Sequence, residues 1–471
     1  MRFRSAEVVL ILLVSRLPLA AQSLDGLWRS EGYGDVFAIK GSAWKTFEVT
    51  STTCVGGFTA AQTAGASAGR DATFKATDQF DTDSPQFFVR SGGSNDHKRL
   101  HLEGAASDIR IDRIPRIPEV CDHTTPDTPQ DNFEVFTRTW AEQYISFDLK
   151  HVDWEKVVAA NRPKVTAKTT PPELFDILVG MIRPFGDAHT SIKAPGIKRD
   201  FKGFKLGMQR MPKSALEATD RVYLKNGLEN FCRHQMQYGH IDGATGYFRI
   251  LSFEEYSADG EFGSDLAELE KALDTVFSDP NLKALVIDVR INSGGSDPLG
   301  LAIASRLTAH EYLAYTKVAR ADPVDRNKWT PGDPSMVKPS SRPGFHGPVV
   351  ELTGPSTVSA GETFTQALMG RTPHITRIGE NTQGVFSDVL GRRLPNGWRF
   401  GLPNEVFLTP DGKAFDGPGI PPDIQVPVFA ASDLAAGKDP AMAKAIDVLA
   451  LTRAQQHDDS LTRSGAGKAN R

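Results

Sequence analysis

The sequence predicts an α/β protein whose largest domain contains a mainly parallel sheet. From about residue 243, segments with the patterns of strands and helices alternate, which is typical of strands joined by crossover helices. Residues 284–289 form a nearly continuous apolar run, as expected of a strand covered on both faces. The length of 471 residues leaves room for two or three domains. We expect the α/β domain to span residues 200–454.

Individual elements of this domain follow from local patterns. The expected strands are residues 247–253, 284–289 and 349–352, and the expected helices are residues 265–277, 298–307, 359–369 and 442–453. The dipeptide Asn396-Gly397 is a signal for a tight hairpin turn. Beyond the last helix the chain is polar, so residues 455–471 are expected to form a disordered tail.

Two regions precede the α/β domain. Residues 22–116 contain short β-type runs separated by Gly, Ser and Asp clusters, which predicts a small antiparallel barrel or sandwich. Residues 117–199 begin as a Pro-rich linker and then take on a helical period. Their first helix would bury one apolar stripe, and a second helix is expected over residues 172–183. The stripe consists of Phe133, Phe136, Trp140 and Tyr144.

The first 21 residues have the layout of a secretory signal peptide. Arg2 and Arg4 precede an apolar run over residues 8–14, and Ala20 and Ala21 supply small residues before a cleavage site. A buried N-terminal helix and a retained membrane anchor are the alternatives, but the run is shorter than the roughly 20 residues that cross a bilayer. We therefore expect an exported protein, periplasmic or extracellular, without stable membrane insertion.

Composition argues against several kinds of partner. The 54 basic and 58 acidic side chains give a net charge of −4, which offers no electrostatic reason to expect nucleic acid. The three cysteines are Cys54, Cys121 and Cys232, and they lack CxxC-type spacing, so we expect no metal and no cofactor. In an exported chain two of them can pair. Cys54 and Cys121 both lie outside the α/β domain and form the predicted disulfide.

Ser359 is the first candidate for chemistry, because it lies between a predicted strand and a predicted helix. A serine at a helix start is often only an N-cap. Here small residues follow it, Ala360 and Gly361, so a substrate can approach closely. A helix N-terminus also offers free N–H groups to a developing oxyanion, and a sharp strand-to-helix turn exposes the nucleophile in many serine hydrolases.

Three further segments carry candidate residues. Residues 288–295 end a buried strand with Gly294 and Gly295, which let the backbone turn sharply toward a ligand. Residues 185–190 contain His189, and residues 415–423 contain Asp416. Each has a plain structural reading as well: a βα turn in which Asp288 and Arg290 pair, a structural histidine, and a surface turn.

Together the four segments resemble the tail-specific, or C-terminal processing, serine peptidase family, which includes the tricorn core peptidase. The family pattern Asp-x-Arg-x-Asn-x-Gly-Gly matches residues 288–295, and Ser-Ala-x-Glu matches residues 359–362. Gly-Glu-x-Thr-x-Gly matches residues 379–384, and the Asp-Gly, acidic-Gly and Gly-Ile-x-Pro-Asp steps match residues 411–423. The resemblance covers roughly residues 130–450 and implies a crotonase-like, Clp-like α/β core.

The resemblance also implies residue roles. Ser359 would be the nucleophile, and the N–H groups of Gly294 or Gly295 and of Ala360 would form the oxyanion hole. Many members use a Ser–Lys dyad, but Val385 stands where that lysine would follow the Gly-Glu-x-Thr-x-Gly motif. The Asp-x-His-Thr segment around His189 instead resembles the tricorn-like branch, with His189 as general base.

Asp416 is the expected carboxylate that orients the histidine. Only about fifty residues lie between Ile192 and Gly246, too few for the PDZ domain that many relatives carry. The sequence therefore predicts a peptidase that acts through an acyl-enzyme on a peptide or protein substrate, and it leaves the oligomeric state open. The alternatives are a non-catalytic binding protein on the same scaffold and a hydrolase of another ester or amide.

Overall fold

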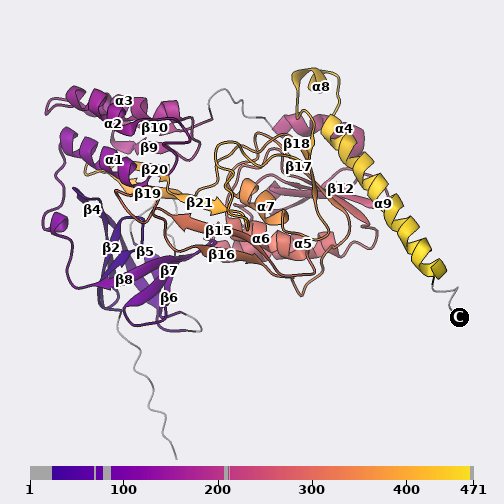
Figure 1. The fold of residues 1–471 in the computed structure, drawn as a ribbon, viewed down its shortest axis with the longest axis horizontal. Helices are drawn as coiled ribbons and strands as arrows, with labels where there is room; N and C mark the ends of the chain where they lie inside the picture. Colours follow the sequence, from indigo (N-terminus) through magenta and orange to yellow (C-terminus); the bar gives the residue numbers. More distant parts are fainter. Residues whose placement is uncertain (1–23, 68–69, 78–85, 206–210, 212, 467–471) are drawn as a thin grey trace, which may run out of the picture.

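The computed structural model describes residues 24–67, 70–77, 86–205, 211 and 213–466 of the chain. Figure 1 shows an N-terminal barrel, a helical region beside it, and a larger α/β region that carries the C-terminal helix. The segment expected to be a signal peptide, residues 1–21, lies outside the described residues.

The N-terminal region is a closed antiparallel barrel, which confirms the first of the two expected architectures. Its first and last strands pair with each other, so the barrel leaves no open edge. The interior is filled by large apolar side chains, with Trp28 and Trp44 almost fully buried. The strands are β1 (Gly26–Ser30), β2 (Asp35–Lys40), β3 (Ala43–Val49), β4 (Cys54–Ala64), β5 (Ala72–Ala76), β6 (Gln86–Ser91), β7 (His97–Leu102) and β8 (Ile109–Ile114).

A disulfide joins Cys54 and Cys121, as predicted, with their Cα atoms 5.1 Å apart. It ties the first residue of β4 to the short 3-10 helix η1 (Glu119–Cys121) that follows the barrel. The bridge therefore fixes the exit of the chain from the barrel toward the helical region.

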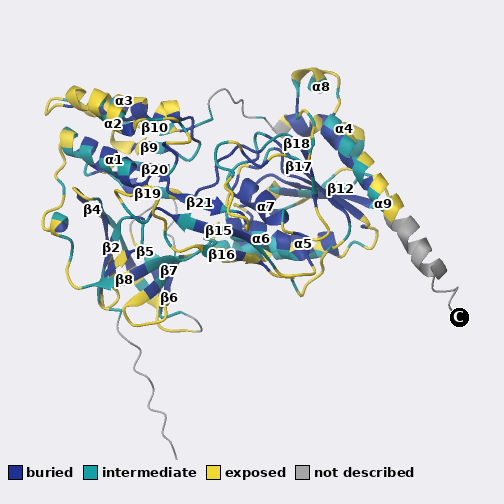
Figure 2. Cartoon of the chain, in the orientation of Figure 1, coloured by how far each residue is buried: buried dark blue, intermediate teal, exposed yellow. Residues whose placement is uncertain are grey.

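The helical region contains α1 (Pro129–Gln143), α2 (Trp154–Asn161) and α3 (Pro171–Ile182). The predicted apolar stripe of α1 is buried, and each of the three helices begins after a Thr or Asp at its N-cap. Sequence patterns missed α2, because eight residues offer too few turns for a clear period. The outer surface of α3 is exposed, whereas strands of the large sheet are buried (Figure 2).

A four-stranded sheet crosses the expected boundary at residue 199 and joins two distant parts of the chain. Its order is β10 (Arg199–Lys202), β9 (Ser191–Ala194), β20 (Arg399–Pro403) and β19 (Val389–Arg393). The predicted hairpin connects β19 and β20, with Gly397 N–H donating to the Leu394 carbonyl over 2.9 Å. Trp398 and Phe400 of this hairpin pack in the core of the helical region.

The α/β region contains the expected parallel sheet, extended at one edge by antiparallel strands. The strand order is β11 (Glu229–Phe231), β12 (Met236–His240), β13 (Thr245–Ile250), β14 (Ala284–Asp288), β17 (Val349–Thr353), β18 (Thr376–Gly379) and β22 (Ile424–Gln425). The five strands from β13 to β22 run parallel. Alternate residues of β14 belong to two different cores, so both of its faces are covered.

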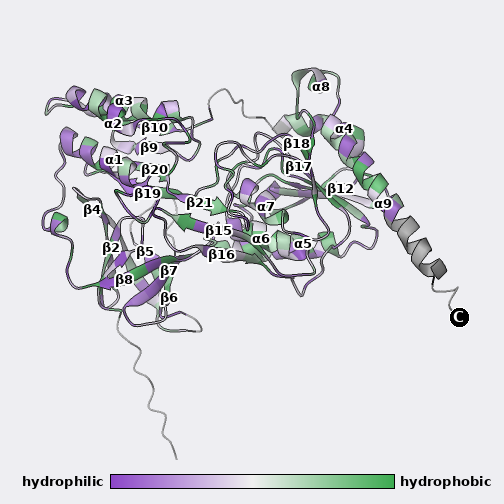
Figure 3. Cartoon of the chain, viewed as in Figure 1, coloured by the Kyte–Doolittle hydropathy of each residue, from purple (hydrophilic) through white to green (hydrophobic). Residues whose placement is uncertain are grey.

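Helices cover the two faces of this sheet. On one face lie α5 (Phe262–Phe277), α6 (Asp297–Arg306) and α7 (Ala360–Leu368), and on the other lies α9 (Pro440–Ala466). The helix α9 packs through residues near its start and runs to Ala466, so the expected disorder from residue 455 is replaced by a helical backbone up to that point. Figure 3 shows hydrophobic and hydrophilic segments alternating along the described part of α9.

A small third sheet lies between the barrel and the α/β region. It contains β16 (Asp333–Val337), β15 (Tyr312–Ala319) and β21 (Glu405–Leu408), in that order. Across the described ranges of the chain, no helix is both long enough and apolar enough to cross a membrane.

Candidate active site

Ser359 occupies a strained turn between β17 and α7. Its backbone has φ 57° and ψ −124°, in the left-handed half of the map that non-glycine residues rarely enter. Such a conformation costs of order 1–3 kcal/mol and persists only where the surroundings impose it. Here Ser359 N–H donates to the carbonyl of Val385 over 3.1 Å. The turn holds the serine at the start of α7, as the strand-helix pattern predicts.

A buried carboxylate holds the loop beside the serine. Glu362, in the first turn of α7, accepts hydrogen bonds from the N–H groups of Gly384 and Val385 at 2.6 and 2.8 Å, and from the Thr382 hydroxyl at 2.6 Å. It also accepts a longer bond of 3.3 Å from Ser359 N–H. Burial raises the pKa of Glu362 to about 7, although these hydrogen bonds oppose the shift.

The paired glycines Gly294 and Gly295 lie against Ser359, but their N–H groups differ in whether they already have a hydrogen-bond acceptor. A Cβ atom on Gly294 would be 2.7 Å from Ser359 Cβ, so only glycine fits there. The N–H of Gly294 already donates to Asn292 Oδ1 over 2.9 Å. Within the described residues, the N–H groups of Gly295 and Ala360 have no hydrogen-bond acceptor. Of the two glycines named as alternatives, Gly295 is therefore the better oxyanion donor.

His189 is presented by a tight turn that precedes β9. Asp187 Oδ1 accepts the His189 backbone N–H over 3.0 Å, and Asp187 Oδ2 accepts the Tyr144 hydroxyl over 2.9 Å. The turn packs against Gly203, where a Cβ atom would lie 1.8 Å from the Asp187 carbonyl oxygen. The core residue Tyr144 of the helical region thus supports the histidine turn.

The surroundings of His189 favour its neutral form. Burial lowers the pKa of His189, while the charges of Asp187 and Asp388 and a hydrogen bond to the Ser387 backbone oppose this shift, and Lys202 reinforces it. The Nδ1 atom is buried and has no hydrogen-bond partner among the described atoms. A neutral imidazole with an unused nitrogen can accept a proton.

Ser359 and His189 face the same cavity, whose volume is about 780 Å³. The cavity lies between the α/β region and the sheet that contains β9. Gly295, Gln383 and Val389 contribute to its wall. No hydrogen bond joins Ser359 to His189 in the described structure, and such contacts are often long before substrate binds.

Asp416 lies outside this cavity. It lines a separate small pocket together with Asp187, Val385 and Ser387. Asp416 Oδ1 accepts the Phe386 N–H over 3.4 Å, and the buried Oδ2 has no partner among the described atoms. Burial raises the pKa of Asp416 to about 7, and the charges of Glu362 and Asp187 add to the shift. Among the described residues, no hydrogen bond joins Asp416 to His189.

Sequence patterns missed Lys205, which reaches the loop beside the serine from a distant segment. Its Nζ donates to the carbonyl oxygens of Gln383 and Gly417 at 2.6 and 3.4 Å. Burial lowers the pKa of Lys205, while the charge of Glu362 opposes the shift. No motif marks this residue, because its role depends on the tertiary approach of two segments.

Asp288 and Arg290 have the structural role that was one of their two readings. Arg290 is fully buried and pairs with Asp288 at 2.7 Å and with Asp439 at 2.8 Å. These bonds anchor the end of β14 and the start of α9. In the ranges that the structure describes, no three His, Cys, Asp or Glu side chains are grouped as metal ligands.

The site shares three features with serine hydrolases. They are a strained serine after a parallel strand, free N–H groups beside it, and a histidine that faces the same cavity and whose neutral form is favoured. Sequence comparisons agree with this class. Residues 244–426 match the family model of Peptidase family S41, and residues 125–183 match that of the Tricorn protease C1 domain. The first match contains Ser359, and the second contains α1, α2 and α3 in full.

Individual relatives give the same assignment. The carboxy-terminal-processing protease of Bartonella bacilliformis is 26% identical over 186 residues, which are 40% of this chain and 39% of that protein. The chain thus matches about two fifths of the length of that relative. A crystal structure of a candidate peptidase from Parabacteroides merdae is 27% identical with a TM-score of 0.58, and covers 69% of this chain and 97% of its own.

Mature CPAF in complex with lactacystin has a similar fold, with a TM-score of 0.50 and 12% identity over 69% of this chain and 98% of its own. Together the family matches and the relatives support a serine-type peptidase, which is a hydrolase.

Proposed function

We propose that the protein is a serine peptidase that cleaves peptide bonds through an acyl-enzyme on Ser359, with His189 as general base. The observation that carries the proposal is the position of both side chains on one cavity, with Ser359 on a strained turn. A hydroxyl is a weak nucleophile near neutral pH and needs a neighbouring base. Burial favours the neutral form of His189, and its Nδ1 atom has no partner among the described atoms, so it meets this need.

The proposed reaction has two halves. Ser359 Oγ attacks the peptide carbonyl carbon while His189 takes the hydroxyl proton, and the N–H groups of Gly295 and Ala360 stabilise the resulting oxyanion. The C–N bond then breaks, and His189 returns the proton to the leaving amine. In the second half water attacks the acyl ester, His189 again carries the proton, and Ser359 is released.

Lys205 is the competing base, since a lysine serves in the Ser–Lys branch. Its Nζ donates to two carbonyl oxygens, and these bonds favour the ammonium form, which has no lone pair to accept a proton. We therefore assign Lys205 to holding the loop at Gln383 and Gly417. Asp416 is assigned a supporting role through Asp187 or Ser387, which line its pocket.

We also propose that the protein is exported. Support comes from the Cys54–Cys121 bridge, because structural disulfides persist mainly in oxidising compartments. Mass spectrometry of the protein isolated from its native cells should give a mature N-terminus at Gln22. An N-terminus at Met1 in protein recovered from the cytosol would contradict export.

A fluorophosphonate probe and a peptide library test the activity. The purified protein should be labelled at Ser359, and it should release new peptide termini from the library. No labelling at any pH would favour the binding-protein alternative, which needs no reactive serine. Labelling with cleavage of ester substrates but of no peptide would favour the alternative of another hydrolase.

A further inference from the structure

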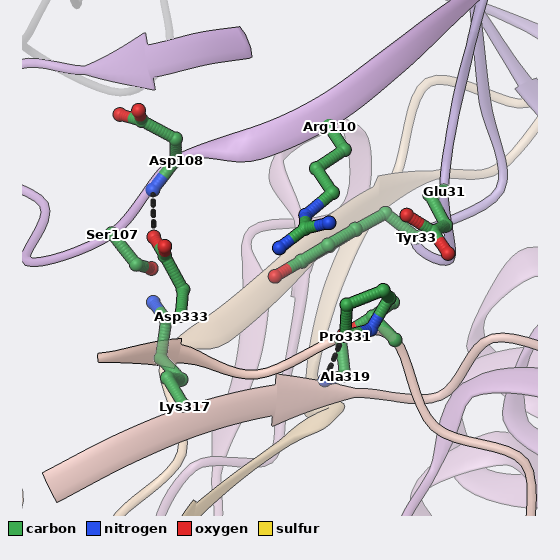
Figure 4. A pocket seen from close by; sticks show the side chains of 10 residues that line it. Glu31, Tyr33, Ser107, Asp108, Arg110, Lys317, Ala319, Pro331 and Asp333 are labelled. Atoms are coloured by element: carbon green, nitrogen blue, oxygen red, sulfur yellow. Dashed lines mark hydrogen bonds between the residues drawn. The ribbon is translucent and has the colours of Figure 1, made fainter. Parts of the chain in front are cut away.

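A buried lysine joins three distant segments close to the candidate active site. Lys317, on β15, is only 5% exposed, and its Nζ lies 2.6 Å from Asp388 Oδ2 and 3.3 Å from Glu405 Oε2. The Tyr33 hydroxyl of the barrel donates to Glu405 Oε1 over 2.5 Å. Figure 4 shows Tyr33 and Lys317 lining one small pocket where the barrel meets β15.

Burying such a cluster lowers the stability of the fold unless its charged groups are placed accurately. Moving the Lys317 ammonium and the Glu405 carboxyl out of water costs free energy that only good geometry recovers. Glu405 is 4% exposed and burial raises its pKa to about 7, whereas Asp388 lies at the solvent end with 47% of its side chain exposed. Desolvation opposes ionisation of Asp388, but Lys317, a hydrogen bond to Glu405 and the charge of His189 together hold the pKa of Asp388 below its usual value.

The segment that carries Asp388 is fixed by its backbone as well. The Ser387 hydroxyl accepts the N–H groups of Asn404 and Glu405, both over 3.0 Å, and donates to the Asp388 carbonyl over 2.6 Å. Residues 387 and 388 are therefore held against the start of β21.

This segment and His189 flank the same strand, β20. In the sheet of β9, β20 and β19, Ser191 pairs with Gly401 and Val389 pairs with Pro403. If the β9 pairing is extended by two residues, His189 and Val389 lie on opposite sides of Pro403, and both residues line the large cavity. His189 also interacts with the Ser387 backbone and with the charge of Asp388.

We propose that Asp388 is a positioning residue for His189, held in place by Lys317 and, through Glu405, by Tyr33 of the barrel. This inference rests on the proposed function, in which His189 is the base. It gives the barrel a part in the active site: Tyr33 anchors the far end of a chain of contacts that ends at the histidine. Asp388 then tunes and orients the imidazole from the side of β19.

Other charges also face His189, and the test must allow for them. The charged and titratable neighbours that act on the ring or line its cavity are Asp187, Lys193, Asp200, Lys202, Glu254 and Glu255. None of them is bonded to Lys317 in the described structure. If only the charge of Asp388 is removed, the change in the titration of His189 should therefore report the effect of Asp388.

The test measures the rate of fluorophosphonate labelling against pH for Asp388→Asn. Loss of a nearby negative charge lowers the pKa of His189, so the acid limb should move to lower pH. The plateau rate should fall about 3- to 30-fold, since a weaker and less well oriented base assists the serine less. Asp322→Asn, at an exposed turn, is the matched control and should keep the wild-type profile.

A second variant keeps the inference testable if Asp388→Asn misfolds. Asp388→Asn leaves Lys317 without its nearest carboxylate, so Asp388→Asn/Lys317→Met, which removes both charges, should show the same shift. Tyr33→Phe should lower the plateau about 2- to 10-fold, as expected for one lost hydrogen bond. Tyr312→Phe, whose hydroxyl has no partner among the described atoms, should not.

The outcomes separate this inference from the proposed function. Suppose that wild type is labelled and His189→Ala is not. If the folded Asp388 and Tyr33 variants then keep the wild-type midpoint and plateau of the labelling rate, the inference is overturned and the proposed function stands. If wild type itself is not labelled, the proposed function fails, and this inference with it.

Discussion

The backbone N–H of Ser359 donates to the carbonyl oxygen of Val385, over 3.1 Å. Val385 is thus a direct neighbour of the nucleophile, at the position where a Ser–Lys enzyme has its lysine. Its side chain is apolar and cannot accept a proton. The loop that carries it is instead held by Glu362. We therefore expect the base to come from across the cavity.

Ser359→Ala should abolish both peptide cleavage and fluorophosphonate labelling. The hydroxyl is the proposed attacking group, whereas the loss of a helix N-cap costs only about 1 kcal/mol of unfolding free energy. Urea unfolding followed by circular dichroism checks the fold. Ser356→Ala, at another serine of the cavity wall, is the control and should remain active. Wild-type turnover by Ser359→Ala would rule out the assignment of the nucleophile.

His189→Ala should lose at least about 1,000-fold in labelling rate, because a serine without its base is a poor nucleophile. In the wild-type protein the rate should rise with pH as His189 loses its proton. Burial lowers the pKa of this histidine, so the midpoint should lie below the ordinary histidine value of about 6.5. A pH series of labelling rates measures both quantities.

Lys205→Met separates the two candidate bases. It removes an ammonium that holds two carbonyl oxygens, so we expect a loss of about 3- to 30-fold with the acid limb unchanged. The opposite ranking, in which Lys205→Met is inactive and His189→Ala keeps near-normal turnover, would transfer the role of base to the lysine.

Asp416→Asn should give an intermediate loss, about 10- to 100-fold, smaller than that of His189→Ala. The carboxyl lies in a neighbouring pocket and acts through other groups, and its pKa of about 7 leaves it partly protonated near neutrality. Steady-state kinetics on a cleaved peptide measures the effect. Asp411→Asn, at a nearby exposed turn, is the control. If Asp416→Asn were folded and as inactive as His189→Ala, a direct role would replace the supporting one.

The sequence predicted the parts of the fold that have local signals. The covered strand β14, the helix that starts after Ser359 and the hairpin at Gly397 each follow from a periodicity or a turn dipeptide, and the structure has them. The sheet that crosses residue 199 was not predicted, because β19 and β20 return from a distant part of the chain to pair with β9. Such long-range pairing leaves no mark in a local pattern.

The candidate site shows the same difference between residues with a local sequence signal and residues whose role depends on tertiary contacts. Ser359, His189 and Gly295 lie in motifs, and the structure brings all three to one cavity. Asp388 and Lys205 have no motif, since each matters through a tertiary contact. Gly294 could not be distinguished from Gly295 until the bond from its N–H to Asn292 was visible.

Replacing Cys54 and Cys121 by serine should destabilise the protein without changing the catalytic residues. The bridge closes a loop with a sequence separation of 67, for which chain entropy predicts a loss of about 4 kcal/mol in unfolding free energy. Urea unfolding of the double variant and of oxidised wild type measures the difference. The free thiol Cys232 supplies the control, Cys232→Ala, which should leave the bridge intact. Equal stability of double variant and wild type would contradict the prediction.

Glu351 should make the stability of the α/β region fall as pH rises. It is fully buried on β17, Oε1 accepts the Thr365 hydroxyl, and Oε2 has no partner among the described atoms. Burial raises its pKa from 4.5 to about 7. A carboxyl whose folded-state pKa is raised contributes stability below its unfolded pKa and loses that contribution as pH rises through the folded value.

Glu351→Gln removes this titration while keeping the shape of the side chain. Between pH 5 and pH 8, the unfolding free energy of wild type relative to Glu351→Gln should therefore fall by about 1–3 kcal/mol. Urea unfolding at the two pH values gives the difference, and Glu311→Gln, at an exposed glutamate, should show none of it. A constant difference between wild type and Glu351→Gln would mean that the raised pKa of Glu351 does not affect stability between pH 5 and pH 8, which would contradict the prediction. If Glu351 titrated below pH 5 instead, the charge of Arg377, which opposes the shift, would outweigh the effect of burial.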